Sequence, residues 1–284
     1  MKSLNPKAFA LACVFLLFSG SPGTGAESKR DEAWDILQIN VIEKSTEKRA
    51  IAVRVLALLP GDARALGLVQ KASVDEKPEV RAAAATALGQ FHGKSSVAIL
   101  HKLLSDPEPS VALAAASALM PSKDEAAYDV YYEFLTGDRK TGKGLIAGQM
   151  KTLKNPKKMA ELGVEEGIGF IPFAGIGLSA FKTLRVDDVS PVRAAAAKML
   201  ANDPDPESGR ALVVGASDKS WIVKTAALEA IAKRGDPQLL DGIFPAMMDN
   251  NTSVRCTAAA AVIRLSTLAS AKNAQGKGAE SNSK

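Results

Sequence analysis

Apolar residues recur at helical spacing through most of this chain, in short stretches separated by polar turns. Apolar positions three and four residues apart predict amphipathic helices. The clearest stretches open with Val, continue with a basic residue and then with small residues, as at 80–85 and 254–259. Turn-forming residues at 60–62 interrupt the pattern, so we expect one helix at 47–59 and a second one from Ala63.

An acidic residue followed six positions later by a basic one recurs with a period of 31 residues. The four clear pairs are Asp75 and Arg81, Asp187 and Arg193, Asp218 and Lys224, and Asp249 and Arg255. Self-similarity at this period is typical of a solenoid built from helical hairpins. An Asp at the end of one helix can cap the next helix and meet a cation one turn further on. We therefore interpret the pairs as a structural ladder and not as catalytic carboxylates.

The repeats divide the chain into segments. We expect a signal peptide at 1–26, an N-terminal capping helix at 27–44, repeats one to three at 45–138, a basic insertion plus a degenerate Gly-rich apolar repeat at 139–187, further repeats and a terminal helix at 188–271, and a disordered tail at 272–284. The capping helix would cover the outer face of the first repeat, which has no neighbour. The terminal helix has no second helix after it, and the tail is too polar to form a core.

The N-terminus has the three parts of a secretory signal. Lys2 and Lys7 precede an apolar stretch at 8–18, and small residues follow up to Ala26. The apolar stretch is too short to span a bilayer. Its removal predicts an exported protein, periplasmic or secreted, and lowers the formal net charge from +5 to +3. A charge this small is not typical of a nucleic-acid-binding protein.

The repeat unit resembles a known family. Each unit begins with an acidic residue, a short link with Pro or Ser, and Val-Arg. An Ala-rich helix, a Gly- or Pro-bearing turn and a second helix ending in Asp follow. This order resembles HEAT-like repeats of the phycobilisome-lyase type, and it covers roughly 45–268. The resemblance implies an all-α fold, a right-handed α-solenoid of about six to seven two-helix repeats. It also implies that partners bind along the concave side, which the resemblance assigns to the second helices.

Residues for catalysis are scarce. The two histidines, His92 and His101, are not followed by Glu, whereas a related HEAT-like enzyme type, deoxyhypusine hydroxylase, binds two irons through His-Glu pairs. We find no Cys/His metal spacing, no nucleophile elbow and no phosphate-binding loop. We therefore expect no enzyme, no cofactor and no metal, with a lyase-like enzyme subunit as the remaining enzymatic alternative.

The irregular middle segment is strongly basic. It contains seven cations and no acid between positions 139 and 158: Arg139, Lys140, Lys143, Lys151, Lys154, Lys157 and Lys158. An apolar, Gly-rich stretch with Phe170 and Phe173 follows. Cations and inserting aromatic residues together suit an anionic membrane surface, which makes a peripheral membrane-associated adaptor our first alternative. Alternatively, 168–184 forms the buried half of a degenerate hairpin, the more frequent role of an apolar stretch of this length.

A second candidate surface lies on the second helices. The chain has three tyrosines: Tyr128, Tyr131 and Tyr132. Tyrosine is favoured at interfaces. Packing into the core could explain at least one of them equally well. We expect them to line the concave side together with three basic or titratable residues: Lys71, His101 and Lys102. The sequence thus favours a non-enzymatic scaffold of the cell envelope that binds an unidentified protein partner there and no nucleic acid.

Overall fold

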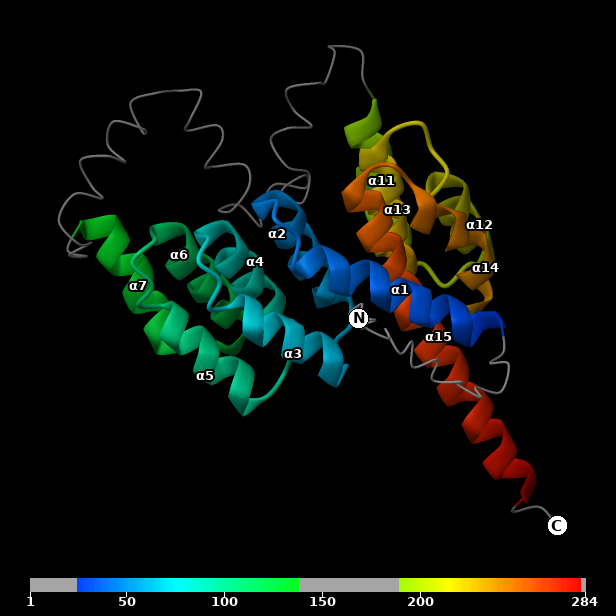
Figure 1. Ribbon diagram of the computed structural model, residues 1–284, viewed down its shortest axis with the longest axis horizontal. Helices are drawn as coiled ribbons and strands as arrows, with labels where there is room; N and C mark the ends of the chain where they lie inside the picture. The colour runs from blue at the N-terminus through cyan, green and yellow to red at the C-terminus, as the bar shows by residue number, and fades with distance from the viewer. Residues whose placement is uncertain (1–24, 138–188, 282–284) are drawn as a thin grey trace, which may run out of the picture.

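The computed structural model describes residues 25–137 and 189–281, which form helices and turns with no β-strand among them (Figure 1). The helices before the gap are α1 (Gly25–Val41), α2 (Thr46–Val55), η1 (Leu56–Leu58), α3 (Ala63–Ala72), α4 (Pro78–Leu88), α5 (Lys94–Leu103), α6 (Pro109–Leu119), η2 (Met120–Ser122) and α7 (Glu125–Thr136). Those after it are α11 (Ser190–Leu200), α12 (Pro206–Gly215), α13 (Trp221–Arg234), η3 (Pro237–Leu239), α14 (Leu240–Ile243), η4 (Phe244–Met248) and α15 (Thr252–Ser281).

The turn at 60–62 follows the first helix of the first hairpin, and the second helix, α3, begins at Ala63 as the sequence predicts. Gly61 has φ of +86°, a conformation that costs glycine nothing. The Asp62 carboxylate then accepts a hydrogen bond from the Ala65 amide at 2.9 Å and caps α3. In the third hairpin, Asp124 is the N-cap of α7, since its carboxylate accepts from the Ala126 amide at 3.1 Å.

The described helices form an all-helical solenoid, but their order in space differs from their order in the chain. The first helices of the hairpins pack side by side in the order α6, α4, α2, α15, α13 and α11. The last helix of the chain therefore lies between the first hairpin and the hairpin of α13 (Figure 1). The N-terminal and C-terminal hairpins thus meet at α15, and α6 and α11 stand at the two ends.

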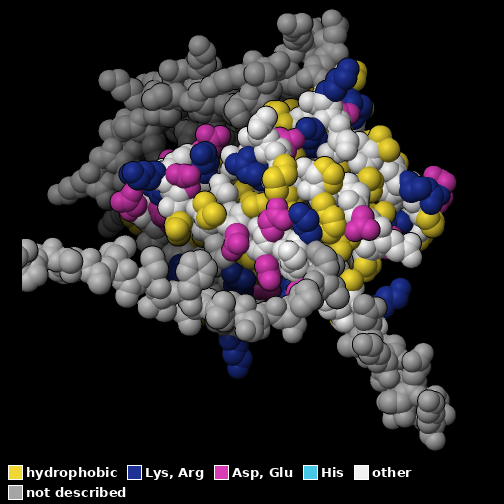
Figure 2. Space-filling model, turned by 45° about the vertical axis from the view of Figure 1, so that its right-hand side comes forward, with side chains coloured by type: hydrophobic (Ala, Val, Ile, Leu, Met, Phe, Trp, Pro, Cys, Tyr) yellow, Lys and Arg dark blue, Asp and Glu magenta, His cyan; other side chains and the backbone are white. Residues whose placement is uncertain are grey.

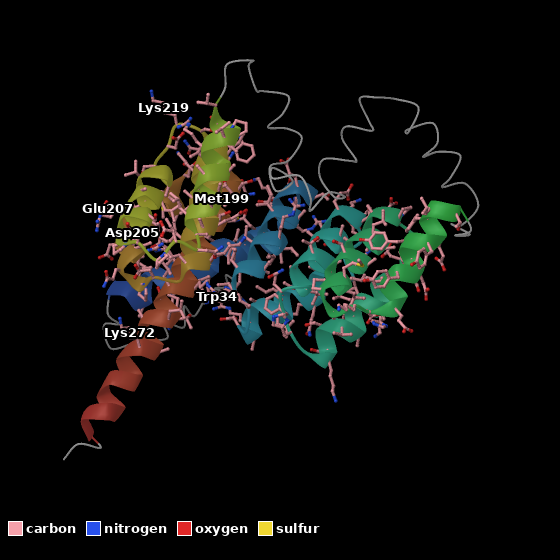
Figure 3. The ribbon with its side chains drawn as sticks, turned by 180° about the vertical axis from the view of Figure 1, so that it is seen from behind. Trp34, Met199, Asp205, Glu207, Lys219 and Lys272 are labelled. Atoms are coloured by element: carbon pink, nitrogen blue, oxygen red, sulfur yellow. The ribbon has the colours of Figure 1, made fainter. Side chains whose placement is uncertain are left out.

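Helix α1 completes the hairpin that α15 begins. It packs along α15 and also contacts α2, so it takes the place of the missing second helix. The expectation that 27–44 covers an outer end of the array is therefore wrong, because α1 lies in the middle of the array. The buried side chains of Trp34 and Leu37 show how firmly this helix is packed. The guanidinium of Arg64 on α3 lies 4.5 Å from the Trp34 ring centroid (Trp34 is labelled in Figure 3). This cation–π contact connects α1 with the first hairpin.

Arg264 joins the two halves at this junction. From α15, its Nε donates to the Ala232 carbonyl of α13 at 2.6 Å, and one terminal nitrogen donates to the Leu58 carbonyl of η1 at 3.3 Å. Both carbonyls lie at helix ends, where they have no partner within their own helix. A single side chain therefore connects backbone groups that are 174 residues apart in sequence.

Helix α15 is a core helix that continues beyond its buried part. Its residues 252–272 are long and apolar enough to cross a membrane by length and composition. Most of this apolar stretch is buried against neighbouring helices, and Cys256, Ala258 and Val262 are fully buried, which explains its apolar character. The helix runs on to Ser281, so the tail expected to be disordered from 272 is helical up to that residue. Extending an existing helix costs little, because the unfavourable nucleation step is already past.

The first helices line the inner side of the curve. They contact one another directly, as α2 does α4 and α11 does α13, whereas α3, α5 and α7 make no comparable contact with each other. In a curved double layer of helices, the layer with the closer spacing is the concave one. The alanines of the first helices, such as Ala84 and Ala115, are fully buried and allow this close approach. The prediction of a concave side made of second helices is therefore wrong.

Candidate functional site

The ladder of charges links each hairpin to the next, with a pairing that differs from the sequence expectation. Arg81 donates from two nitrogens to the Asp106 carboxylate, at 2.7 and 2.9 Å, and from the third to the Asp75 carbonyl at 2.9 Å. The cation thus meets the backbone of the Asp six residues before it and the carboxylate of the Asp 25 residues after it. Arg49 repeats the arrangement with the Asp75 carboxylate, at 3.0 and 3.1 Å.

Each ladder carboxylate also holds the start of the next first helix. Asp75 accepts from the Lys77 amide, and Asp106 accepts from the Glu108 amide, both at 2.9 Å. One Asp therefore fixes both the end of its own hairpin and the helix that follows. This geometry explains why the pattern repeats with the length of one hairpin.

The C-terminal half contains the same ladder. Arg193 donates to the Asp218 carboxylate, and Lys224 donates to Asp249 at 2.6 Å. Arg255, in the last first helix, donates to the Asp249 carbonyl at 2.6 Å. Asp187 lies outside the described residues.

The pairing changes the acidity of the ladder. Burial alone would raise the pKa of Asp75, but hydrogen bonds from Arg49 and from the Lys77 amide outweigh it, and the pKa is lowered. Asp249 follows the same balance, with Lys224 as its main donor, and its pKa is also lowered. These carboxylates therefore stabilise the fold above their unfolded pKa, and this stabilisation is lost as the pH falls through their lowered pKa values. Nothing in this arrangement is free to react.

The inner face of the solenoid carries a second, separate set of polar side chains. On every first helix, the fifth and ninth residues after the ladder position share one face, because four residues make about one turn. Arg264 occupies the ninth position of α15, and its bonds to α13 and to η1 show that this face adjoins both neighbouring helices. The fifth positions, in spatial order from α11 to α6, are Lys198, Glu229, Ala260, Arg54, Thr86 and Ser117.

Four charged residues of this face form what we call the inner-face cluster: Arg54, Lys198, Glu229 and Lys233. Lys198 and Glu229 are half-buried, while Arg54 and Lys233 are exposed. Burial raises the pKa of Glu229, and the charges of Lys198, Lys233 and Arg54 lower it only in part. The cluster thus places one poorly solvated carboxyl group among three cations. Sequence reasoning missed it, because counting five or nine residues on from each ladder cation gives its members but not the face that they share.

The six residues predicted to bind a partner lie on the outer, second helices. Lys71 is on α3, His101 and Lys102 are on α5, and all of them are exposed. His101 Nε2 lies 2.7 Å from a carboxylate oxygen of Asp124, which caps the neighbouring α7. These residues therefore form an outer surface, and partner binding by them stays a prediction.

The tyrosines of α7 divide between core and surface. Tyr131 packs against the hydrophobic core, whereas the side chain of Tyr132 is 61% exposed. Tyr128 is also exposed, and so is Leu135 at the end of the helix. Packing into the core therefore accounts for one tyrosine, and two remain available at the surface.

The face of α11 that points away from α13 is open in the described part of the chain. Val192 is 66% exposed and Met199 is 78% exposed (Met199 is labelled in Figure 3). The residues equivalent to Val192 in other first helices are Val80, Val223 and Val254, and each is at most 4% exposed. Figure 2 shows apolar side chains reaching the surface between charged ones on the face it presents. Among the described residues, α11 is therefore the outermost first helix on this side of the array.

Several predicted features lie outside the described residues: the signal sequence up to residue 24, the seven basic residues at 139–158, and Phe170 with Phe173. Within the described ranges, no group of three or more His, Cys, Asp or Glu side chains is arranged to hold a metal ion. Cys256 is fully buried there, and burial raises its pKa to about 11. Its thiol therefore stays protonated at neutral pH.

Several solved structures are distantly similar to this chain. No curated protein sequence matches the chain. Among solved structures, human deoxyhypusine hydroxylase in complex with glycerol is 15% identical over 86% of this chain and 99% of its own, with a TM-score of 0.33. The complex of CpcE and CpcF of phycocyanin lyase from Nostoc sp. PCC7120 is 18% identical, covering 92% of this chain and 100% of that one, with a TM-score of 0.31. A designed armadillo repeat protein is 16% identical, covering 81% and 98%, with a TM-score of 0.24.

Structural similarity this low says nothing about activity. The repeat family itself is matched far more directly. The family model described as HEAT repeats matches residues 37–120, 65–141 and 179–269, which together make up well over half of the chain. With hairpins, ladder and family match in agreement, the chain belongs to the family of HEAT-repeat proteins.

Proposed function

We propose that this HEAT-repeat protein is a non-enzymatic scaffold that holds a protein partner along the inner face of its first helices. The observation that carries the proposal is the continuity of that face across the junction at α15. Arg264 bonds to the neighbours on both sides, so polar positions on α13, α15 and α2 form one row and not two separate surfaces. A row that spans several helices suits an extended protein segment better than a small molecule, which needs an enclosed pocket.

The site of action that we propose is the cell envelope. The support is the N-terminal sequence, in which two lysines, an apolar stretch and small residues have the order of a secretory signal. Export is tested by expressing the full chain with a C-terminal tag and sequencing the N-terminus of the protein recovered from the envelope fraction. Cleavage near Ala26 is expected, and an intact N-terminus in the cytoplasm would refute this part of the proposal.

The binding surface is tested with bulky substitutions on either side of the solenoid. Thr86→Trp and Ser117→Trp block the inner face at two exposed positions, and His101→Trp and Tyr132→Trp alter the outer surface. Chemical crosslinking in envelope extract, followed by mass spectrometry, measures which partners each variant retains. We expect the inner substitutions to abolish crosslinking and the outer ones to leave it unchanged.

The opposite pattern would assign binding to the outer surface expected from the sequence. Loss of partners in no variant would refute both surfaces. Circular dichroism and thermal unfolding of each variant show whether the fold is retained, since exposed positions on helices tolerate substitution well.

A further inference from the structure

The inner-face cluster differs from the ladder in that its charges are not paired among the described residues. Every ladder cation described above donates hydrogen bonds to a carboxylate, a backbone carbonyl or both. By contrast, Arg54, Lys198, Lys233 and Glu229 form no ion pair or side-chain hydrogen bond with any other described residue, although they lie close enough to influence the acidity of Glu229. Charges that are brought together without being paired are typical of a surface that recognises a ligand.

Two residues at the centre of the row, Ala260 and Thr257, are fully buried. Ala260 holds the fifth position of α15, between Glu229 on α13 and Arg54 on α2, and its side chain is a single methyl group. One turn before it on the same face, Thr257 is fully buried, and its hydroxyl has no hydrogen-bond partner among the described residues. The centre of the row is thus closed to solvent, and a ligand meets only the charged side chains on either side of it.

The charge of the cluster defines the ligand. Three cations and one carboxylate leave an excess of two positive charges even when Glu229 is ionised. Away from the cluster the row continues with uncharged polar residues, since Thr86 on α4, Gln90 just after α4 and Ser117 on α6 are exposed. The row therefore offers cations along one half and neutral hydrogen-bonding groups along the other.

From this arrangement we propose that the inner-face cluster binds the carboxylate side chains of an acidic segment in the partner protein. The inference rests on the proposed scaffold function and specifies its partner. Lys198, Lys233 and Arg54 each attract one carboxylate, and the long cationic side chains adapt to its position.

Glu229 selects against a compact anion of high charge. A phosphate group concentrates its charge on one centre, so in the middle of the cluster it is repelled by the Glu229 carboxylate. An acidic peptide carries its charges on separate side chains, each of which can reach a cation at the edge of the cluster. Its backbone amides can donate to Glu229 at the same time, which satisfies a half-buried carboxyl group.

The test measures binding of a fluorescein-labelled, glutamate-rich peptide to the purified mature protein by fluorescence anisotropy. Lys198→Gln, Lys233→Gln and Arg54→Gln are each expected to weaken binding by about three- to five-fold. The matched controls Lys94→Gln, at the start of α5, and Lys123→Gln, just before α7, remove exposed cations of the outer layer and are expected to change binding by less than about two-fold. Binding is expected to weaken as salt rises to about 0.15 M, because the cations of the cluster are partly open to solvent.

Equal losses for inner and outer substitutions would overturn the inference, since they would show attraction to the overall charge alone. Absence of peptide binding at low ionic strength would also overturn it. Competition by inorganic phosphate at the same concentration of charge would replace it with a phosphate site. If the peptide fails to bind while Thr86→Trp still abolishes crosslinking of the partner, the scaffold function stands and the acidic ligand is wrong.

Discussion

The ladder makes a quantitative prediction about Arg81 and Asp106. Their side chains are only 16% and 7% exposed, and they share two charge-assisted hydrogen bonds of 2.7 and 2.9 Å. A hydrogen bond to a charged group contributes about 1.5 to 3 kcal/mol, and the cost of removing both charges from water offsets part of the sum. We expect a coupling free energy of about 2 kcal/mol between the two side chains.

A double-mutant cycle measures that coupling without the other contacts of either residue. Asp106→Ala also removes the acceptor of the Glu108 amide, and Arg81→Ala also frees the Asp75 carbonyl. Both losses occur in the single and the double variants and therefore cancel. Urea unfolding of the four proteins gives the free energies, provided that the dependence on urea is the same in all four.

Arg193 and Asp218 provide the matched comparison. They occupy the same ladder positions, but the Arg193 side chain is 46% exposed, so solvent screens the pair. A coupling of about 0.5 kcal/mol is expected for it, as for other exposed ion pairs. The reasoning would be refuted if the Arg81 pair coupled no more strongly than this one, because burial would then have no effect on the ladder.

Three further predictions follow from single contacts. Glu229→Gln should raise the midpoint of thermal unfolding at pH 7 and leave it unchanged below about pH 4. Burial raises the folded pKa of Glu229 above its ordinary value of 4.5, so ionisation of this carboxyl group disfavours the folded state. The same midpoint for the variant and the original protein at both pH values would contradict this. Gly89→Ala should lower the free energy of unfolding in urea by about 1 kcal/mol or more, since the new Cβ would lie 3.0 Å from Ala118 Cβ. The Cβ added by Gly67→Ala meets no atom within 4 Å, so this variant should stabilise α3 by about 0.5 to 1 kcal/mol. Arg264→Met should lower the unfolding free energy by about 2 kcal/mol, and a change below about 0.5 kcal/mol would show that the bonds to α13 and η1 do not hold the halves together.

The local features of the fold could be predicted because they depend on neighbouring residues. The turn at 60–62 and the start of α3 follow from the conformations that Gly61 allows and from the capping carboxylate of Asp62, and both act within one turn of helix. The repeat itself was visible because most hairpins carry a cation at the same position and an Asp at the same distance from it. The sequence did not reveal which Asp each cation binds, since two carboxylates lie at regular distances from every Arg.

The inner-face cluster could not be recognised from local patterns. Lys198, Glu229 and Arg54 stand on three different helices, and only the packing of α11, α13, α15 and α2 brings them to one face. The assignment of the concave side failed for a related reason. Curvature depends on the spacing between helices of different hairpins, and this spacing is set by alanines that look alike in the sequence wherever they point.

The position of α15 gives the array its cooperativity. In a linear solenoid each repeat contacts only its neighbours, so loss of the last helix exposes one face and leaves the others covered. Here the last helix of the chain contacts α1, α2 and α13, so both halves depend on it. The hairpin that it forms with α1 joins segments that are more than 200 residues apart in sequence, and it can form only after both segments are present. The inner face, which crosses this hairpin, is therefore complete only in the fully folded molecule.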